Sequence, residues 1–361
     1  MILLNNYRCR ELVERSVKAF RLKLNSYTVL TEAATGYYMF TPMIAALAGA
    51  KKVYLLAATS RFGKAQEVKR AVMRLADSWG IKNRISILTS RKDIRIQEAD
   101  IVTNLGFVRP LDKSFLSGLK KGAVIPLMCE TWEYRPDDLD VDTCHKFNIP
   151  VLGTNEQHHN VRTFVYLGYM AAKMLLELGL EVFLSQVVVL GDNRFGYSIR
   201  DTLNSLGAQV IYLSTNEKKI PLKGKMILQK ADALIIADHT SGKMLVGPGG
   251  LIGAKELHAI NHDLVVAHIC GGIDELAMRS EGLQVFPKII AAPGRMSVTT
   301  DYIGPKPLID LHTAGLKVAE EMARAKLRLR DAFEAEMAVL KKTNLAQGFP
   351  GRHYGQKVKG K

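Results

Sequence analysis

Short apolar runs alternate with amphipathic stretches along most of this chain. In residues 185–214, the β-branched run Val187–Leu190 ends at Gly191, and an amphipathic stretch and a second apolar run at 210–213 follow. This order predicts a strand, a tight turn ending at Gly196, a helix and a second strand. It is typical of the opening of a doubly wound nucleotide-binding sheet.

The same alternation extends over both halves of the chain. Further strands are predicted at 52–57, 84–88, 99–104, 122–128, 149–153, 231–238, 264–270 and 288–293. Further helices are predicted at 5–24, 41–50, 65–79, 161–177 and 308–340. Because strands that alternate with helices usually form a parallel sheet with covered faces, we expect an α/β fold.

We expect two domains, because 361 residues are enough for two full cores. Residues 1–160 are predicted to form an N-terminal substrate-type α/β domain, and residues 161–307 a Rossmann dinucleotide-binding-like domain. The helix at 308–340 is expected to return to the first domain, and residues 341–361 form a basic tail. The predicted fold class is therefore two doubly wound Rossmann or flavodoxin-like parallel-sheet domains with a C-terminal helix returning to the first domain.

Two short segments resemble each other. Residues 60–63 read Ser-Arg-Phe-Gly and residues 193–196 read Asn-Arg-Phe-Gly, each after a predicted strand and before a predicted helix. We interpret them as an internal pseudo-repeat of two similarly wound sheets rather than as a solenoid.

Composition narrows the class of protein. A hydrophobic content of 47% and a charged content of 24% are those of an ordinary globular protein. No apolar run approaches the roughly 18 residues of a membrane helix, and the first residues lack a secretory apolar region, so we expect a cytoplasmic protein. The four cysteines show no CxxC spacing, and His158 and His159 lack a third spaced ligand, so no metal site is predicted.

Part of the formal net charge of +15 comes from the last residues of the chain. The last residues carry Arg352, Lys357, Lys359 and Lys361 with no acid. No nucleic-acid recognition motif accompanies them, so we expect acidic small-molecule substrates and cofactors rather than a specific nucleic acid.

The predicted glycine turn is the candidate cofactor site. Dinucleotide-binding turns have glycine at the positions of 191, 193 and 196, and position 193 here is asparagine. Ser214 stands where an acid would hold the ribose hydroxyls, so either NAD or NADP fits. A Rossmann-type domain that no longer holds a dinucleotide is the alternative. The candidate cofactor-binding residues are Gly191, Asn193, Arg194, Phe195, Gly196 and Ser214.

Residues 100–300 resemble the D-isomer-specific 2-hydroxyacid dehydrogenase family and, more broadly, the formate dehydrogenase and S-adenosylhomocysteine hydrolase superfamily. Segment 141–178 is similar to the family's crossing from substrate domain to cofactor domain, and 190–196 (LGDNRFG) is similar to its glycine turn. The stretch 231–278 is similar to the part that carries the family's catalytic arginine. The resemblance implies NAD(P)-dependent hydride transfer, a site in the cleft between two domains, and a homodimer.

The chain departs from this family at its catalytic positions. Cys270 stands where the family has an arginine before a glycine pair, and Gly294 stands where a histidine follows a proline. The glutamate that would orient that histidine is absent from 282–288. The resemblance therefore implies the fold, and the 2-hydroxyacid chemistry does not transfer with it.

Residues that replace these missing catalytic groups are expected near the carboxyl ends of the strands, where open α/β sheets bind ligands. Arg109 or Arg295 is predicted to hold a carboxylate, and His268 or His239 to move a proton. Each candidate also has a structural interpretation, such as a hydrogen-bonded core histidine for His268. Glu130 is a further candidate catalytic residue. Other polar candidates are Asn104, Trp132, Glu133, Arg135, Asn155, Glu156, His158, His159, Asp238 and Cys270, and the loop 294–307 is a candidate for specificity.

Three functions follow as hypotheses. The first is a diverged NAD(P)-dependent oxidoreductase acting on a small polar 2-oxo, 2-hydroxy or imino acid in a biosynthetic pathway. The second is a non-redox biosynthetic enzyme on the same two-domain frame, without a dinucleotide. The third is a ligand-binding protein with a vestigial pocket. Retained Gly191, Arg194 and Gly196 favour the first, and Asn193 favours the others.

Overall fold

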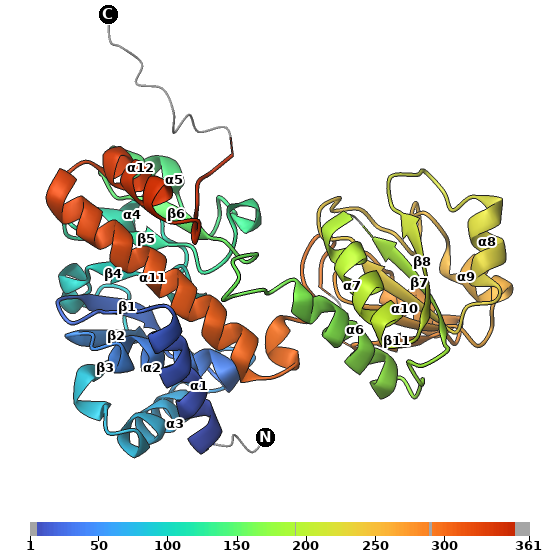
Figure 1. The fold of residues 1–361 in the computed structure, drawn as a ribbon, viewed down its shortest axis with the longest axis horizontal. Helices are drawn as coiled ribbons and strands as arrows, with labels where there is room; N and C mark the ends of the chain where they lie inside the picture. The colour runs from blue at the N-terminus through green and yellow to red at the C-terminus, as the bar shows by residue number, and fades with distance from the viewer. Residues whose placement is uncertain (1–5, 192, 289–290, 351–361) are drawn as a thin grey trace, which may run out of the picture. The chain divides into compact units, whose positions relative to one another are not determined.

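The structure is a computed structural model that describes residues 6–191, 193–288 and 291–350, except the side chain of residue 193. The chain divides into two compact units. Unit 1 comprises Met1–Val161 and Pro305–Lys361, and unit 2 comprises Arg162–Gly304. Both units combine parallel strands with covering helices, which confirms the predicted α/β fold class (Figure 1).

Unit 1 contains a parallel sheet in the order β3-β2-β1-β4. A bridge between Ile101 and Val124 continues it to β5, which pairs with β6 in parallel, and β12 pairs antiparallel with β6. The strand order therefore reverses between β1 and β4. The strands are β1 (Thr28–Glu32), β2 (Lys52–Leu56), β3 (Ile85–Leu88), β4 (Ile101–Val102), β5 (Ile125–Pro126), β6 (Val151–Thr154) and β12 (Ala346–Gln347).

Strand β1 is not among the predicted strands, although it lies inside the sheet. All of its residues, Thr28–Glu32, are buried. Its apolar run is short, because Val29 and Leu30 lie between threonines. The hydroxyl of Thr103 donates to that of Thr31 at 2.9 Å, so the polar atom of this strand is satisfied within the core.

Helices cover the sheet of unit 1 (Figure 1). Its α-helices are α1 (Asn6–Ala19), α2 (Phe40–Leu47), α3 (Ala65–Ser78), α4 (Lys113–Ser117), α5 (Val141–Lys146), α11 (Pro305–Leu329) and α12 (Ala332–Lys342). Its short 3-10 helices are η1 (Gly36–Met39), η2 (Lys82–Arg84), η3 (Ile94–Glu98), η4 (Gly106–Val108) and η5 (Thr131–Glu133).

Helix α11 packs against α1, α2, α12 and the strands β4, β5 and β6, so the C-terminal helix does return to the first unit. The single helix predicted at 308–340 is wrong in one respect, because the chain breaks it. Arg330 has φ 59, and Asp331 starts α12 by accepting a hydrogen bond from the Glu334 N–H.

The basic tail predicted at 341–361 begins too early. Lys341 and Lys342 end α12, and Ala346–Gln347 forms β12 at the edge of the unit 1 sheet. Residues 351–361 lie outside the described residues.

Unit 2 contains a parallel sheet in the order β11-β10-β9-β7-β8, which reverses between β7 and β9. Its strands are β7 (Gln186–Gly191), β8 (Gln209–Ser214), β9 (Ala233–Ala237), β10 (Val265–His268) and β11 (Gln284–Phe286). Its helices are α6 (Val165–Glu177), α7 (Asn193–Ser205), α8 (Leu222–Leu228), α9 (Ala254–Ile260), α10 (Glu275–Ser280) and the 3-10 helix η6 (Thr300–Tyr302). This is the flavodoxin-like strand order.

Two local predictions in unit 2 are wrong. The last strand is Gln284–Phe286 rather than 288–293, of which residues 289–290 lie outside the described part. The turn after β7 does not extend to Gly196, because α7 begins at Asn193.

The resemblance between the two Arg-Phe-Gly segments does not extend to their conformations. Ser60–Gly63 is a turn closed by reciprocal backbone hydrogen bonds, and its Phe62 is 68% exposed. Phe195 instead lies in the first turn of a helix and is 4% exposed. What the two units share is the winding of their sheets.

Among the described residues, no helix combines the length and the apolar character that crossing a membrane requires.

Candidate functional site

The carboxyl end of β1 presents an acid at the point where the strand order of unit 1 reverses. Glu32 closes β1 and is 7% exposed. The backbone N–H of Phe107, in η4, donates to its Oε2 at 3.3 Å. Gly106 lies against the same oxygen, because a Cβ added there would be 1.6 Å from it. Burial raises the pKa of Glu32, and the Phe107 N–H and the charge of Arg109 offset that rise in part.

Arg109 follows β4 and is fixed by two contacts. Its Nε donates to the carbonyl of Asn104 at 2.5 Å, and its Nη1 pairs with Asp138 at 2.8 Å. Arg91 donates to the carbonyls of residues 107–110 and so holds this loop in place. Asn104 is buried and accepts a hydrogen bond from the Met128 N–H at 2.8 Å, which ties β4 to the end of β5.

Glu130 is fully buried behind β5 and β6. Its Oε1 accepts from the Glu156 N–H at 3.3 Å, and its Oε2 accepts from Trp132 Nε1 at 2.6 Å. Its own N–H donates to Glu133 at 3.3 Å, so the two glutamates form a capping box around η5. This carboxylate therefore organises the loop after β5, and its predicted catalytic role stays a prediction.

The thiol of Cys129 lies within this acidic group. Burial, together with the charges of Glu133 and Glu156, raises its pKa well above the usual range. A thiol of this kind stays protonated and is a poor nucleophile.

In unit 2 the glycines around the β7–α7 junction permit close approach. A Cβ on Gly191 would lie 3.1 Å from the carbonyl oxygen of Ala237 in the neighbouring strand β9. A Cβ on Gly196 would lie 2.3 Å from the ring of Tyr212, whose hydroxyl donates to the Gly191 carbonyl at 2.6 Å. The contact at Gly196 is one of the three glycine functions of a dinucleotide-binding turn, the close helix–strand packing, and Gly191 lets β7 lie close to β9.

The end of β9 adds a buried acid and an aromatic stack. Asp238 is 2% exposed, and its Oδ1 accepts from the N–H groups of Thr240 and Ser241 at 3.0 and 2.9 Å. Its Oδ2 is buried and finds no hydrogen-bond partner among the described residues. The ring of His239 stacks on Phe195 with centroids 3.7 Å apart. Because β7 and β9 flank the reversal of strand order, these groups lie where open α/β sheets bind ligands.

Two of the other predicted cofactor residues, Ser214 and Arg194, have exposed side chains. Ser214 ends β8 with its side chain exposed, and its hydroxyl accepts from the Asn216 N–H at 3.2 Å. Arg194 is exposed in the first turn of α7, and its guanidinium lies 5.9 Å from the ring centre of Phe164. The side chain of Asn193 lies outside the described residues.

His268 is held inside unit 2. It is 0% exposed, its Nε2 lies 2.8 Å from the Pro287 carbonyl, and its Nδ1 lies 2.9 Å from the Ser297 hydroxyl. Burial lowers its pKa. With both nitrogens hydrogen-bonded, the geometry offers no support for its predicted proton transfer, which stays a prediction.

Cys270 and Arg295 occupy the neighbouring segment. The Cys270 sulfur lies 3.8 Å from that of Met296 in a buried apolar cluster. Arg295 is exposed, and its carbonyl accepts from the Gly271 N–H at 2.8 Å. The loop after residue 293 therefore pairs with the end of the sheet through its backbone.

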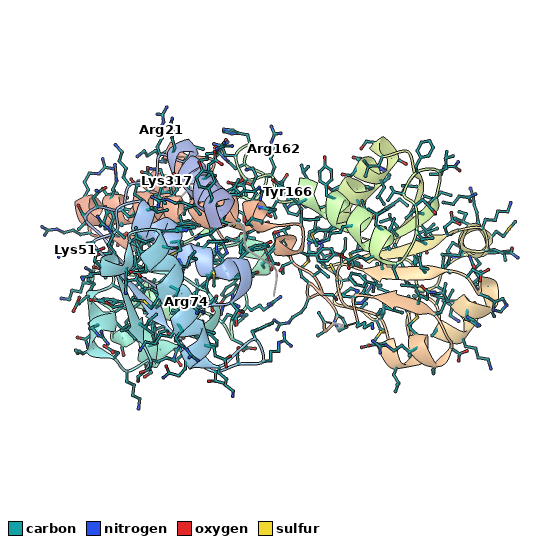
Figure 2. All side chains as sticks on the ribbon, turned by 90° about the horizontal axis from the view of Figure 1, so that it is seen from below. Arg21, Lys51, Arg74, Arg162, Tyr166 and Lys317 are labelled. Atoms are coloured by element: carbon teal, nitrogen blue, oxygen red, sulfur yellow. The ribbon has the colours of Figure 1, made fainter. Side chains whose placement is uncertain are left out.

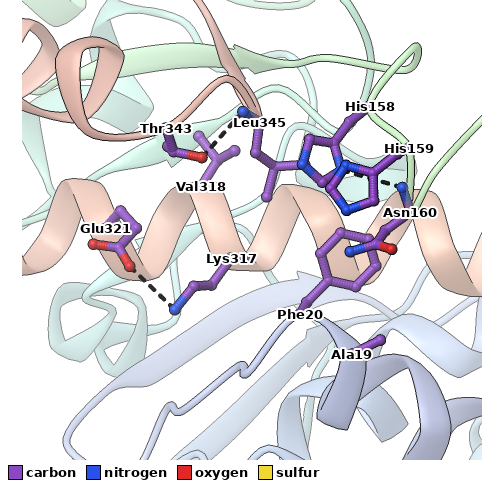
Figure 3. Close-up of a pocket in the computed structure, with 10 residues that line it drawn as sticks. All are labelled: Ala19, Phe20, His158, His159, Asn160, Lys317, Val318, Glu321, Thr343 and Leu345. Atoms are coloured by element: carbon purple, nitrogen blue, oxygen red, sulfur yellow. Dashed lines mark hydrogen bonds and ion pairs between the residues drawn. The ribbon is translucent and has the colours of Figure 1, made fainter.

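A small hollow of about 230 Å³ lies in unit 1 near the end of α1 (Figure 3). The rings of His158 and His159 stack with centroids 4.2 Å apart, and the Asn160 N–H donates to His158 Nδ1 at 3.3 Å. Lys317 pairs with Glu320 at 2.8 Å and with Glu321 at 3.1 Å. The charged groups here neutralise one another. Within the described residues, no set of three or more His, Cys, Asp and Glu side chains is arranged to hold a metal ion.

Basic side chains are distributed over unit 1 rather than gathered on one element. Arg21, Lys51 and Arg74 are exposed and follow α1, precede β2 and lie in α3, respectively (Figure 2). The high formal charge is therefore spread over separate parts of this unit.

The structure thus brings predicted residues together in two groups, one in each unit. Asn104, Arg109, Glu130 and Glu156 gather at the carboxyl ends of the unit 1 strands, and Gly191, Phe195, Asp238 and His239 gather in unit 2. Glu32 is the residue that sequence reasoning missed. The signal for it is an acid that closes a β-branched run, and it is recognisable only once the strand itself is predicted.

No known protein-family model matches this chain, and no curated protein matches its sequence. Among solved structures, it is similar to a dipicolinate synthase component from Bacillus halodurans, with 11% identity and a TM-score of 0.49 over 85% of this chain and 98% of that chain. It is similar to the NAD-dependent formate dehydrogenase from Staphylococcus aureus in complex with NAD, with 11% identity and a TM-score of 0.41 over 80% of this chain and 93% of that chain. It is also similar to the 2-hydroxyacid dehydrogenase from Ketogulonicigenium vulgare Y25, with 13% identity and a TM-score of 0.42 over 85% of this chain and 95% of that chain. The similar structures thus include a formate dehydrogenase and a 2-hydroxyacid dehydrogenase, as their names give them.

Proposed function

We propose that this chain is an NAD(P)-dependent oxidoreductase that acts on a small polar 2-oxo, 2-hydroxy or imino acid. The observation that carries the proposal is the buried Asp238 Oδ2, which lacks a partner among the described residues at the end of β9. A buried acceptor without a donor is costly, and a bound ligand would satisfy it. The ribose hydroxyls and the carboxamide N–H of a nicotinamide dinucleotide are donors of the required kind.

The residues of unit 2 fit such a cofactor. Gly191 and Gly196 allow the close packing that a dinucleotide-binding turn requires, and the positive end of the α7 dipole favours a phosphate at the helix N-terminus. Ser214 brings no negative charge to the end of β8, so NADP with its 2′-phosphate is accepted as well as NAD. When bound, the nicotinamide supplies or accepts a hydride.

In the substrate, a carboxylate is the group that Arg109 would bind, since its guanidinium is already oriented by Asn104 and Asp138. Arg295 in unit 2 is a second cation for this role, and His239 and His268 remain proposed proton-transfer groups. The biosynthetic role, the homodimer and the cytoplasmic location belong to the same proposal and rest on the sequence resemblance and composition.

The cofactor proposal is tested by titrating the protein with NADH and NADPH and following nicotinamide fluorescence. Both should bind. Ser214→Asp should weaken NADPH binding at least about tenfold, because like charges a few ångströms apart repel by more than about 1.4 kcal/mol near a protein surface. NADH binding should change little.

Ser205→Asp is the matched control, because Ser205 is also exposed in unit 2 and lies at the end of α7. It adds the same charge and should leave both affinities unchanged. Failure of both dinucleotides to bind the parent protein would contradict the proposal.

A non-redox enzyme or a ligand-binding protein on the same frame is the second candidate. The hydrogen bonds on both nitrogens of His268 favour it, because they leave that imidazole without an open nitrogen at the end of β10. A nucleotide or sugar phosphate that stabilises the protein where NADH and NADPH do not would support this candidate.

A further inference from the structure

Two histidines of unit 2 lie next to each other, away from the groups described above. His258 is in helix α9, and His262 follows shortly after the end of that helix. The Nε2 atom of His258 lies 3.1 Å from the Nδ1 atom of His262, and the two ring centres are 4.6 Å apart. Histidines four positions apart bind a single Zn²⁺ ion when both rings project from the same side of a helix.

The distance between these two nitrogens suits a metal ion. Imidazole nitrogens lie about 2.0–2.1 Å from a bound Zn²⁺, so two of them are about 2.9 Å apart when they coordinate at a right angle and about 3.3 Å apart at the tetrahedral angle. The separation of 3.1 Å lies between these values. In the metal-free protein, one nitrogen donates its proton to the other, and a metal ion would take the place of that proton.

Both nitrogens are available for this purpose. Neither has another hydrogen-bond partner among the described residues. The second nitrogen of His258, Nδ1, is buried and has no partner there, so Nε2 is the atom through which this ring would bind an ion. The side chain of His262 is exposed, so its ring can turn until both lone pairs point at one ion.

Asn261 holds the turn between the two histidines in place. Its Nδ2 donates to the carbonyls of Leu228 and Ala231 at 3.0 and 2.7 Å, and its Oδ1 accepts from the Asp263 N–H at 3.1 Å. These bonds tie the turn to the end of α8 and to the segment that precedes β9. Little conformational freedom of the backbone is therefore lost when the two rings bind an ion.

The adjacent histidines of unit 1 do not offer this geometry. The rings of His158 and His159 lie face to face with 36° between their planes, and the Asn160 N–H donates to His158 Nδ1. The lone pairs of an imidazole lie in the plane of its ring, so rings that face each other do not direct their nitrogens at a common point. The pair in unit 2 is therefore the stronger candidate.

The histidine pair lies at the edge of the unit 2 sheet that is opposite the proposed cofactor site. His262 precedes β10, and Asn261 binds the segment before β9, so both lie at the amino ends of these parallel strands. Gly191 and Asp238 lie at the carboxyl ends of β7 and β9. An ion bound by the pair would not contact a dinucleotide at the carboxyl ends, so the two sites are independent.

We propose that His258 Nε2 and His262 Nδ1 together bind one divalent transition-metal ion. Within the part of the chain that the structure describes, no third His, Cys, Asp or Glu side chain joins them, so water molecules would complete the coordination. Imidazole sites of this kind bind Cu²⁺ more tightly than Ni²⁺ or Zn²⁺. Mg²⁺ and Ca²⁺ prefer oxygen ligands and would not bind to this pair.

Copper binding by the full chain without an affinity tag tests the assignment. In isothermal titration with CuCl₂ and glycine as a competing ligand, the parent protein should bind one ion at least about tenfold more tightly than His258→Gln or His262→Gln. The double variant should bind Cu²⁺ no more weakly than either single variant, because one histidine alone forms no chelate. Additive losses would mean that the two rings bind separate ions and would overturn the proposal.

Ala259→Gln is the matched control, because Ala259 is exposed in the same helix and both histidines are kept. It introduces the same side chain and should bind Cu²⁺ like the parent protein. An equal loss of affinity in this control would show that the effect comes from the helix rather than from the imidazoles, and would overturn the proposal.

A second measurement needs no variant and so does not depend on how the variants fold. Electron paramagnetic resonance of the parent protein with one equivalent of Cu²⁺ should show coupling to two imidazole nitrogens, and labelling with ¹⁵N-histidine should change this splitting. A spectrum without imidazole coupling would overturn the proposal. Binding of Cu²⁺ by the parent protein that is no tighter than binding by the double variant would overturn it as well.

Discussion

At the scale of single residues, buried polar groups in this protein fall into two kinds. Some are fully paired inside the core, such as Thr31 with Thr103 and His268 with Ser297 and Pro287. Glu32 and Asp238 differ, since each anchors one carboxyl oxygen to backbone N–H groups and leaves the other without a partner among the described residues. Both lie at a reversal of strand order. The buried Oδ2 of Asp238 is costly to leave unpaired, and a cost of this kind is typical of residues kept for binding or catalysis.

The raised pKa of Glu32 predicts how stability depends on pH. Its pKa is higher in the folded than in the unfolded protein, so its contribution is fully present below the unfolded value of about 4.3 and is lost as the pH rises through the folded value. Glu32→Gln has no charge to bury. Urea unfolding at several pH values should therefore show this variant gaining stability relative to the parent above that window.

The same measurement on Glu67→Gln provides the reference, because this glutamate is exposed. A stability difference between parent and Glu32→Gln that is the same from pH 4 to pH 8 would contradict the pH prediction.

At the scale of elements, small residues decide how closely helices and strands approach. Helices α6 and α7 pack at Gly168, where a Cβ would lie 2.2 Å from the Cβ of Thr202. Gly196 has the same function between α7 and the Tyr212 ring of β8. These contacts position the N-terminus of α7 at the proposed phosphate site.

Gly168→Ala should therefore destabilise unit 2 by about 1–3 kcal/mol, the usual effect of overpacking, despite the higher helix propensity of alanine. Chemical denaturation followed by circular dichroism measures this difference. Gly122→Ala is the control, since no atom lies within 4 Å of its added Cβ, and it should change stability by less than about 0.5 kcal/mol. Equal effects of the two substitutions would mean that α6 and α7 are not packed this closely.

At the scale of the whole molecule, each unit has its own cores. The apolar clusters of unit 2 draw only on residues between 164 and 303, and those of unit 1 only on residues up to 161 and from 309 onwards. Unit 1 is discontinuous in sequence, since β12 pairs at the edge of a sheet that begins near the N-terminus, and α11 and α12 pack against strands of that unit. Unit 2 is continuous in sequence, like many domains that fold independently.

Residues 162–304 expressed alone should therefore unfold cooperatively in urea and bind the same dinucleotide as the full chain. Gly168→Ala should lower the unfolding midpoint in the fragment and in the full protein alike. A fragment without a cooperative transition would show that unit 2 depends on the rest of the chain.

Local patterns predict much of this architecture. The alternation of apolar runs with amphipathic stretches is enough to predict the α/β class and the parallel sheets. Buried parallel strands are continuously apolar, whereas amphipathic helices repeat their apolar positions with the helical period, so the two are told apart in sequence. Strand β1 escapes prediction, because the hydroxyl of its Thr31 has a hydrogen-bond partner 72 positions away rather than in local structure. The break at Arg330 escapes it too, because the apolar pattern continues across that residue.

The amino-acid order by itself determined the alternation of elements, the glycines at 191 and 196 and the polar residues that end the strands, because each depends on neighbours in sequence. Only the tertiary structure decided which of those polar residues keep a side-chain atom without a hydrogen-bond partner among the described residues. It paired His268 on both nitrogens, enclosed Glu130 in a capping box and left Glu32 and Asp238 at the two reversals of strand order. Strand order arises from contacts between distant segments, so local periodicity does not encode it.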